Sequence, residues 1–187
     1  ADASTGYLNA PEAPRRARAL LPNATIIAIL RDPVARAHSH FKHNTKRRRT
    51  TASFEDTLKD AEQRLSAINQ SESTDNPNPD FFHLAYIPCG YYATHLESWL
   101  ECYPASKLRV FHAETFFKNP EPIVHALCDD LNIPRRPLKD TQAHNASTPK
   151  ADPINPATKD RLRAHFAPHN ARLTELLAKH NLNQHAD

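Results

Sequence analysis

The sequence predicts an α/β domain, and three observations support this prediction. Five consecutive apolar residues, Ile26 to Leu30, indicate a buried strand. Asp32 and Pro33 follow almost at once and are typical of a helix start, with Asp as the N-cap and Pro at the first helical position. A second strand is predicted at 107–112, and segments with apolar residues at helical spacing surround both strands. The 187 residues are enough for one domain with a buried core.

Composition limits the classes of protein to which the chain can belong. The formal net charge of +3 fits an anionic ligand but does not require one. The three cysteines, Cys89, Cys102 and Cys128, form no Cys-x-x-Cys pair, which argues against a disulfide framework and a zinc site and favours a reducing compartment. No apolar run approaches the roughly 18 residues of a membrane span, and no signal segment opens the chain. Because the chain starts with Ala and contains no Met, we expect a processed chain or a fragment.

The first third of the chain is predicted to contain two helices with a strand between them. The first helix covers 11–21, has Pro near its start and ends before Pro22-Asn23. The strand at 26–30 contains no polar residue, so we expect it to be buried on both faces, as in parallel sheets. The second helix, at 33–46, has an apolar face formed by Val34, Ala37 and Phe41.

The middle of the chain is predicted to be helical, with one polar interruption. Ser53 and Asp56 resemble a capping arrangement at the start of a helix that runs to residue 70. Its apolar stripe consists of Phe54, Leu58, Ala61, Leu65 and Ile68. The segment 71–80 is rich in Asn and Pro and has no periodicity, so we expect a mobile loop there. A helix at 90–100 follows, and the aromatic residues at three- and four-residue spacing in it are typical of a protein core.

The last part of the chain contains the second strand and three predicted helices. The strand at 107–112 leads into a short helix that starts at Glu114, and a further helix covers 122–131. A second polar loop is predicted at about 143–154. The final helix begins after Asn155, its predicted N-cap, and its apolar face is formed by Leu162, Phe166, Leu173, Leu176 and Leu177. No internal repeat is visible. From the length of the chain we expect residues 1–187 to form a single domain.

Arg31 and Ser39 are the candidate binding residues at the end of the first strand. Ligands of open α/β sheets bind at the carboxyl ends of strands, and a helix N-terminus favours anions. Ser39 lies two turns into the predicted helix, close enough to share one anion with Arg31. Two simpler interpretations stay open. Arg31 can be a surface charge or an ion-pair partner, and the hydroxyl of Ser39 can bond back to the carbonyl of Ala35.

The pattern of a buried strand, Arg-Asp-Pro and then Arg-x-x-Ser resembles the 3′-phosphate-binding segment of sulfotransferases that use 3′-phosphoadenosine 5′-phosphosulfate (PAPS). It is most similar to the heparan-sulfate-like and related bacterial branch of that family. The resemblance implies an α/β fold with a parallel sheet flanked by helices, similar to the P-loop NTPases, here helix-rich and N-terminally truncated. It also implies that Arg31 and Ser39 hold the 3′-phosphate of PAPS, the co-substrate, and that no metal takes part.

Four further residues resemble, in type and approximate place, residues that have known roles in the family. In the family, a loop over the nucleotide touches the phosphates through a Ser and a Lys, which implies nucleotide-binding roles for Ser147 and Lys150, although the two residues after Lys150 depart from the family pattern. The N-terminal end of the pattern Gly-x-Tyr-x-x-His-Leu-x-x-Trp-Leu faces the acceptor in the family, which implies substrate-binding roles for Tyr92 and His95. A place in the core is the alternative for both of these residues.

The family's Gly-rich loop, which cradles the 5′-phosphosulfate, is not found in this sequence. The chain contains only two glycines, Gly6 and Gly90. Residues from Asp2 to Tyr7 resemble the segment that follows the loop in the family, so we expect the chain to be a C-terminal fragment with reduced or no activity. The general base of this branch lies just after the loop, and no catalytic residue is identified here.

The resemblance also indicates the partners of the protein. We expect a nucleotide co-substrate and a hydroxyl or amine acceptor of carbohydrate type, without nucleic acid and without a membrane span. The expected location is cytoplasmic if the protein is bacterial, or the Golgi lumen if the chain belongs to a membrane-anchored eukaryotic enzyme. The alternative function is a basic helical module without catalysis that binds polyanions or nucleic acid through residues 46–49.

Overall fold

The computed structural model describes residues 2–4, 6–71, 81–138 and 153–182. The chain forms two compact units, which are described separately: unit 1 consists of Ala1–Arg31, Tyr92–Ala146 and Asn170–Asp187, and unit 2 of Asp32–Tyr91 and Ser147–His169. Most of the two predicted loops, residues 72–80 and 143–152, lies outside the described part of the chain. None of the described helices has the length and apolar character needed to cross a membrane.

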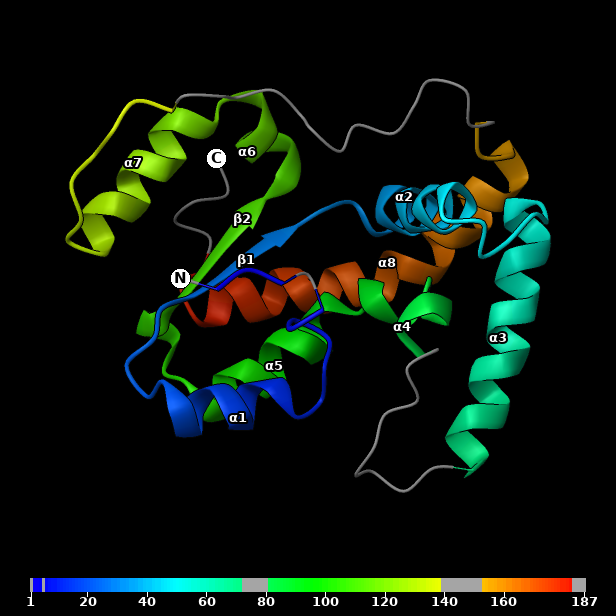
Figure 1. Cartoon of the computed structure of the whole chain (residues 1–187), viewed down its shortest axis with the longest axis horizontal. Coiled ribbons are helices and arrows are strands. Elements are labelled where there is room, and N and C mark those ends of the chain that lie inside the picture. Colours follow the sequence, from blue (N-terminus) through cyan, green and yellow to red (C-terminus); the bar gives the residue numbers. More distant parts are fainter. Residues whose placement is uncertain (1, 5, 72–80, 139–152, 183–187) are drawn as a thin grey trace. The chain divides into compact units, whose positions relative to one another are not determined.

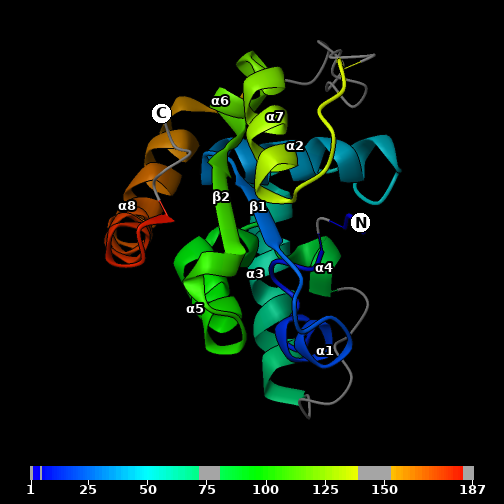
Figure 2. The ribbon, with the colours of Figure 1, turned by 90° about the vertical axis from the view of Figure 1, so that its left-hand side faces the viewer.

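Unit 1 is built on a two-stranded parallel sheet. β1 (Ile26–Leu30) pairs with β2 (Leu108–His112) in a five-residue register that runs from Ile26 opposite Leu108 to Leu30 opposite His112. The strands lie side by side in Figures 1 and 2. This pairing confirms the predicted strands and their parallel direction. Because both strands end at the same edge of the sheet, Arg31 follows β1 at that edge.

Helices cover one face of this sheet. α1 (Ala13–Leu20) packs against α5 (Tyr92–Cys102), and the two helices lie side by side in Figures 1 and 2. The last part of α8 (Pro156–Lys179) completes the same core. The buried residues of this core are Ala28, Leu30, Tyr92, Ala93, Leu96, Trp99, Tyr103, Leu108, Val110, Leu173, Leu176, Leu177 and Leu182. The aromatic stripe of α5 is therefore part of the core, as its spacing predicts.

The other face of β1 is exposed, so the expectation that this strand is buried on both faces is wrong. Ile27 is 42% exposed and Ile29 is 43% exposed. α6 (Ala113–Lys118) and α7 (Pro120–Asp130) follow β2, and Arg109 of β2 forms an ion pair with Asp130 at the end of α7. α6 and α7 cover the face of β2 that carries Arg109. On β1, the face that carries Ile27 and Ile29 stays exposed within the described residues.

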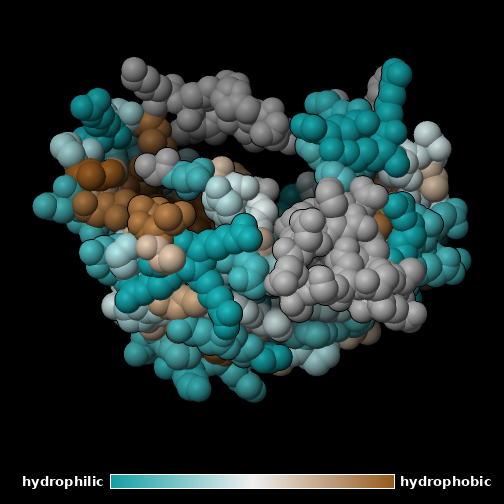
Figure 3. Space-filling view, turned by 60° about the horizontal axis from the view of Figure 1, so that its bottom comes forward, coloured by the Kyte–Doolittle hydropathy of each residue, from teal (hydrophilic) through white to brown (hydrophobic). Residues whose placement is uncertain are grey.

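Exposed apolar side chains are a property of unit 1. Figure 3 shows apolar surface gathered on one side of the visible face, where most of the remaining surface is hydrophilic. All the large hydrophobic residues found exposed in the described part of the chain belong to unit 1: Tyr7, Leu20, Leu21, Ile27, Ile29, Phe117, Leu131 and Ile133.

Unit 2 is helical and contains α2 (Pro33–Lys46), α3 (Phe54–Ser71), α4 (Phe81–Leu84), the 3-10 helix η1 (Pro88–Gly90) and the first part of α8. The predicted caps are confirmed. The carboxylate of Asp32 accepts from the amide of Ala35 at 2.7 Å, and Ser53 and Asp56 bond reciprocally at 3.1 and 2.7 Å. The buried core of the unit consists of Val34, Ala37, Phe54, Leu58, Ala61, Leu65, Leu84, Tyr86, Ile87, Leu162 and Phe166.

Gly90 allows the close approach of η1, α2 and α8 in this core. A Cβ atom at position 90 would lie 2.7 Å from Cε1 and 2.9 Å from Cζ of Phe166, and 3.0 Å from Cβ of Pro33. Phe166 is completely buried and cannot move aside without disturbing its neighbours. A glycine is therefore required at this position for steric reasons.

We expect Gly90→Ala to lower the free energy of unfolding by about 1–3 kcal/mol, the usual cost of overpacking a core. Gly6→Ala is the matched control, because a Cβ atom at position 6 would be 3.8 Å from its nearest neighbour. Urea unfolding of both variants measures the difference. Equal stability of the two variants would show that the contact with Phe166 does not constrain the fold.

Candidate functional site

Arg31 follows the last residue of β1 and is exposed at the carboxyl edge of the sheet. Within the described ranges, its guanidinium forms no hydrogen bond or ion pair. The interpretation of Arg31 as an ion-pair partner therefore has no support in the described part of the chain. A guanidinium without a protein partner at a strand end can bind a phosphate through two parallel hydrogen bonds.

Ser39 lies on α2, half-buried, and its hydroxyl also has no hydrogen-bond partner among residues 2–4, 6–71, 81–138 and 153–182. This differs from Thr45 on the same helix, whose hydroxyl donates to the carbonyl of Phe41 at 3.1 Å. The simpler interpretation, a bond from Ser39 to its own helix, is thus not supported. Arg31 ends the first segment of unit 1 and Ser39 belongs to unit 2, so a shared ligand stays a prediction.

Three residues on one side of α2, the stripe Arg36, His40 and Asn44, contact Tyr86 at its backbone carbonyl, its ring and its hydroxyl. The guanidinium of Arg36 donates to the carbonyl oxygen of Tyr86. The ring of His40 lies 4.6 Å from the Tyr86 ring, and the amide of Asn44 lies 2.6 Å from the Tyr86 hydroxyl. These contacts hold the Arg36 side of α2 against Tyr86.

Further polar contacts extend this stripe. Asn44, which is 1% exposed, also donates to the carbonyl of His83 at 3.0 Å. Arg49 donates to the side-chain oxygen of Asn44 at 3.3 Å and lies 2.9 Å from Nδ1 of His83. The sequence gives no sign of this group beyond the four-residue spacing of Arg36, His40 and Asn44.

Cations dominate the electrostatics around this group. Burial, followed by the charges of Arg36, His43, His83 and Arg49, lowers the pKa of His40 to about 4. Burial, followed by the neighbouring cations, also lowers the pKa of His43. In the part of the chain that the structure describes, the exposed residues Lys46, Arg47 and Arg48 form no ion pair. The end of α2 is thus a cationic surface suited to anionic partners.

The other predicted site residues lie in different surroundings. Tyr92 is 5% exposed and belongs to the core of unit 1. His95 lies half-buried on α5. Ser147 and Lys150 lie outside the described residues. The binding roles of all four residues stay predictions.

The segment that resembles the family's post-loop region contains one defined contact. The hydroxyl of Tyr7 donates to a carboxylate oxygen of Asp2 at 2.8 Å. This hydrogen bond to Asp2, together with the negative charge of Asp2, raises the pKa of the Tyr7 hydroxyl. Nearby, the indole nitrogen of Trp99 on α5 donates to the carbonyl of Leu8 at 3.3 Å and ties the segment to the core of unit 1.

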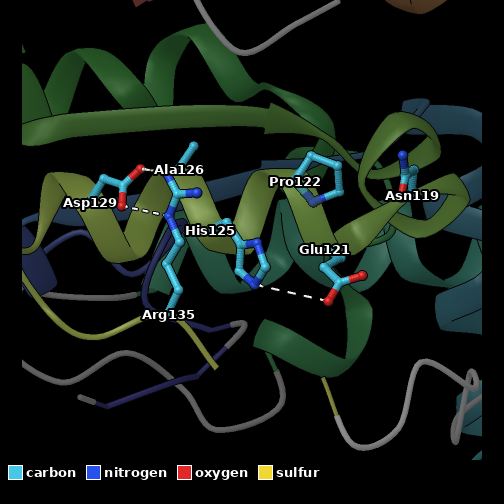
Figure 4. Close-up of a pocket in the computed structure, with 7 residues that line it drawn as sticks. All are labelled: Asn119, Glu121, Pro122, His125, Ala126, Asp129 and Arg135. Atoms are coloured by element: carbon cyan, nitrogen blue, oxygen red, sulfur yellow. Dashed lines mark hydrogen bonds and ion pairs between the residues drawn. The ribbon is translucent and has the colours of Figure 1, made fainter. Parts of the chain in front are cut away.

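An open groove of about 520 Å³ lies on α7, away from the predicted binding residues in the sequence. Figure 4 shows that its charged side chains face one another. Arg135 forms an ion pair with Asp129 and thereby lowers the pKa of that carboxyl, and His125 lies 3.9 Å from Glu121. Because its cations have partners inside the groove, this groove is a poor candidate for binding an anion.

The buried neutral His40 predicts a pH dependence of stability. The pKa of His40 is about 4 in the folded protein and near 6.5 when the group is unperturbed, so the unfolded chain binds this proton first as the pH falls. We expect a loss of about 1.4 kcal/mol per pH unit between pH 6.5 and 4, and no contribution above pH 7. Urea unfolding of the wild type and His40→Gln across this range measures it. Parallel pH profiles for the two proteins would contradict this assignment.

Comparisons with known proteins identify the family. The family model described as "Sulfotransferase domain" matches residues 10–166. A Drosophila melanogaster bifunctional heparan sulfate N-deacetylase/N-sulfotransferase is 33% identical over 141 residues, which are 75% of this chain and 12% of that protein. Human carbohydrate sulfotransferase 15 is 27% identical over 180 residues, 86% of this chain and 31% of that protein.

A solved structure shows the same fold. The crystal structure of a sulfotransferase from Alicyclobacillus acidocaldarius matches with a TM-score of 0.76 and 27% identity, and the match covers 94% of this chain and 63% of that one. The chain spans less than a third of the length of the curated relatives given above. The match of the family model over most of its length shows that this chain belongs to the sulfotransferase domain family.

Proposed function

We propose that the chain is the part of a PAPS-dependent sulfotransferase that binds the 3′-phosphate of the nucleotide, through Arg31 and Ser39. The observation that carries this proposal is that Arg31 follows the end of β1, that Ser39 lies on the next helix, α2, and that neither side chain has a hydrogen-bond partner within the described segments. The start of α2 at Pro33 adds a helix N-terminus, which favours negative charge. A guanidinium, a hydroxyl and a helix N-terminus each favour a doubly charged phosphate as ligand.

The proposed reaction transfers a sulfuryl group. The bond between sulfur and the bridging oxygen of the phosphosulfate breaks, a new bond forms to an acceptor hydroxyl or amine, and the acceptor loses a proton. Adenosine 3′,5′-bisphosphate is the leaving group. As in phosphoryl transfer, the protein contributes mainly by positioning the reactants and stabilising charge. A charge-assisted hydrogen bond from Arg31 is worth about 1.5–3 kcal/mol, or about ten- to a hundredfold in affinity.

We further propose that the acceptor is a carbohydrate. Two of the similar proteins are named for heparan sulfate and carbohydrate sulfotransfer, which supports this class of acceptor. The cationic end of α2, with Lys46, Arg47 and Arg48 exposed, would attract an acidic glycan. His95, half-buried on α5, is proposed as a polar group of the acceptor site.

The chain is proposed to work with a further strand and helix that carry the Gly-rich loop. The sequence contains two glycines in all. Neither lies in a segment that runs from a strand through a Gly-rich turn and a Lys into a helix. The exposed faces of Ile27 and Ile29 on β1 support this proposal, because such residues are normally covered in an α/β sheet. The location of the protein, cytoplasmic or in the Golgi lumen, stays a prediction.

The second candidate function is a basic helical module that binds polyanions without catalysis. The exposed run of Lys46 to Arg48 favours this alternative. A polyanion module would not distinguish nucleotides by a 3′-phosphate, and its affinity would fall steeply with salt. Nucleotide affinities, measured with and without a 3′-phosphate and at two salt concentrations, therefore distinguish the two functions.

We expect the chain to bind adenosine 3′,5′-bisphosphate more tightly than adenosine 5′-phosphate, by about ten- to a hundredfold. Arg31→Lys and Ser39→Ala should each reduce this ratio, because Lys lacks the planar fork of Arg and Ala lacks the hydroxyl. Arg47→Lys is the matched control and should leave the ratio unchanged. Calorimetry at two salt concentrations measures all four proteins. An unchanged ratio in Arg31→Lys would argue against the proposed function.

We expect negligible transfer of labelled sulfate from PAPS to carbohydrate acceptors by residues 1–187 alone. The physical reason is the missing cradle for the 5′-phosphosulfate, without which the leaving oxygen is neither positioned nor stabilised. A complete member of the family serves as the positive control in the same assay. Robust turnover by this chain would refute the proposal that it needs a further segment.

A further inference from the structure

Asn44 and Tyr86 form a buried polar contact that joins α2 to a segment far away in the sequence. The amide nitrogen of Asn44 lies 2.6 Å from the Tyr86 hydroxyl and 3.0 Å from the carbonyl oxygen of His83. Asn44 is 1% exposed and Tyr86 is 2% exposed. Buried polar groups are costly to leave unpaired, so this contact strongly favours one arrangement of α2 against the segment 83–87.

The contact is one of three along the same side of α2. Arg36, His40 and Asn44 are spaced by four residues and touch the backbone carbonyl, the ring and the hydroxyl of Tyr86, respectively. Four-residue spacing places successive side chains on one side of a helix. Contacts on three successive turns prevent α2 from rotating about its axis relative to Tyr86.

The orientation of α2 decides where the Ser39 hydroxyl points. Ser39 precedes His40 and lies about 100° around the helix from it. A rotation of about 20° would move a side-chain atom 4 Å from the helix axis by about 1.4 Å. Misplacement of about 1 Å in a binding group is enough to weaken its contact severely. Ser39 has no hydrogen bond of its own in the described part of the chain that could hold it in place.

We infer that Asn44 and Tyr86 are positioning residues for the nucleotide site. Their hydrogen bond fixes the rotation of α2 and so directs the Ser39 hydroxyl at the 3′-phosphate. This inference rests on the proposed function, in which Ser39 binds that phosphate. It adds two residues that never touch the nucleotide but set its affinity through Ser39.

The test compares affinities for adenosine 3′,5′-bisphosphate and adenosine 5′-phosphate at low temperature, where the variants stay folded by circular dichroism. Tyr86→Phe removes one hydroxyl and keeps the ring against His40. We expect a three- to tenfold loss of affinity for the bisphosphate and an unchanged affinity for the monophosphate. Asn44→Ser is the second variant, with the same expected direction. Thr45→Ala is the matched control, because its exposed hydroxyl bonds only within α2.

A double-mutant cycle separates positioning from general stability. If Tyr86 acts through Ser39, Tyr86→Phe should not change the ratio of affinities in a Ser39→Ala background. A lower melting temperature with an unchanged ratio in Tyr86→Phe would overturn the inference and leave the proposed function intact. A similar loss in the Ser39→Ala background would overturn it as well. A wild-type chain that does not prefer the bisphosphate would refute the proposed function and this inference together.

Discussion

The parallel pairing of β1 and β2 organises unit 1. Five residue pairs, from Ile26 with Leu108 to Leu30 with His112, bring the carboxyl ends of both strands to one edge. The core of α5 and α8 is packed on the Ala28 and Leu30 side of this sheet. β1 ends at Leu30, and Asp32 and Pro33 start the next helix, so the chain leaves the sheet at Arg31. The Arg31 side chain is exposed at this edge of the sheet, where it can meet an anion.

The sequence of the next residues then fixes where α2 begins. Asp32 accepts the amide of Ala35, and Pro33 supplies the first helical residue without losing a hydrogen bond. The apolar residues Val34 and Ala37 are buried in unit 2, while Arg36, His40 and Asn44 contact Tyr86. One helix thus combines an apolar face, a polar face that holds it, and a Ser39 hydroxyl with no partner among the described residues.

Local sequence signals predicted most of the elements because capping, helical spacing and strand runs act over a few residues. The caps at Asp32 and Ser53, the aromatic core stripe of α5 and the strand at 107–112 were all predicted correctly. The burial of Ile27 and Ile29 was not, because a strand's surroundings depend on which segments cover the sheet. An apolar run shows that a strand can be buried on both faces, but not that both faces are covered.

The contacts of Tyr86 likewise could not be predicted from local sequence patterns, because they join segments that are far apart in the sequence. Arg36 and Tyr86 are 50 residues apart, and no local pattern links them. The stripe of Arg36, His40 and Asn44 resembles an ordinary solvated helix face until the fold places an aromatic residue against it. By contrast, Arg31 could be singled out from sequence because its signal, a strand end followed by a helix cap, is local. The predictions for Ser147 and Lys150 fall outside the described residues.

A crystal structure of the chain with adenosine 3′,5′-bisphosphate would show whether Arg31 and Ser39 bind one phosphate, at the 3′ position of the nucleotide. We expect the 3′-phosphate to lie within hydrogen-bond distance of both the Arg31 guanidinium and the Ser39 hydroxyl. A phosphate held instead by the basic run at Lys46 to Arg48, with Arg31 and Ser39 turned elsewhere, would contradict it.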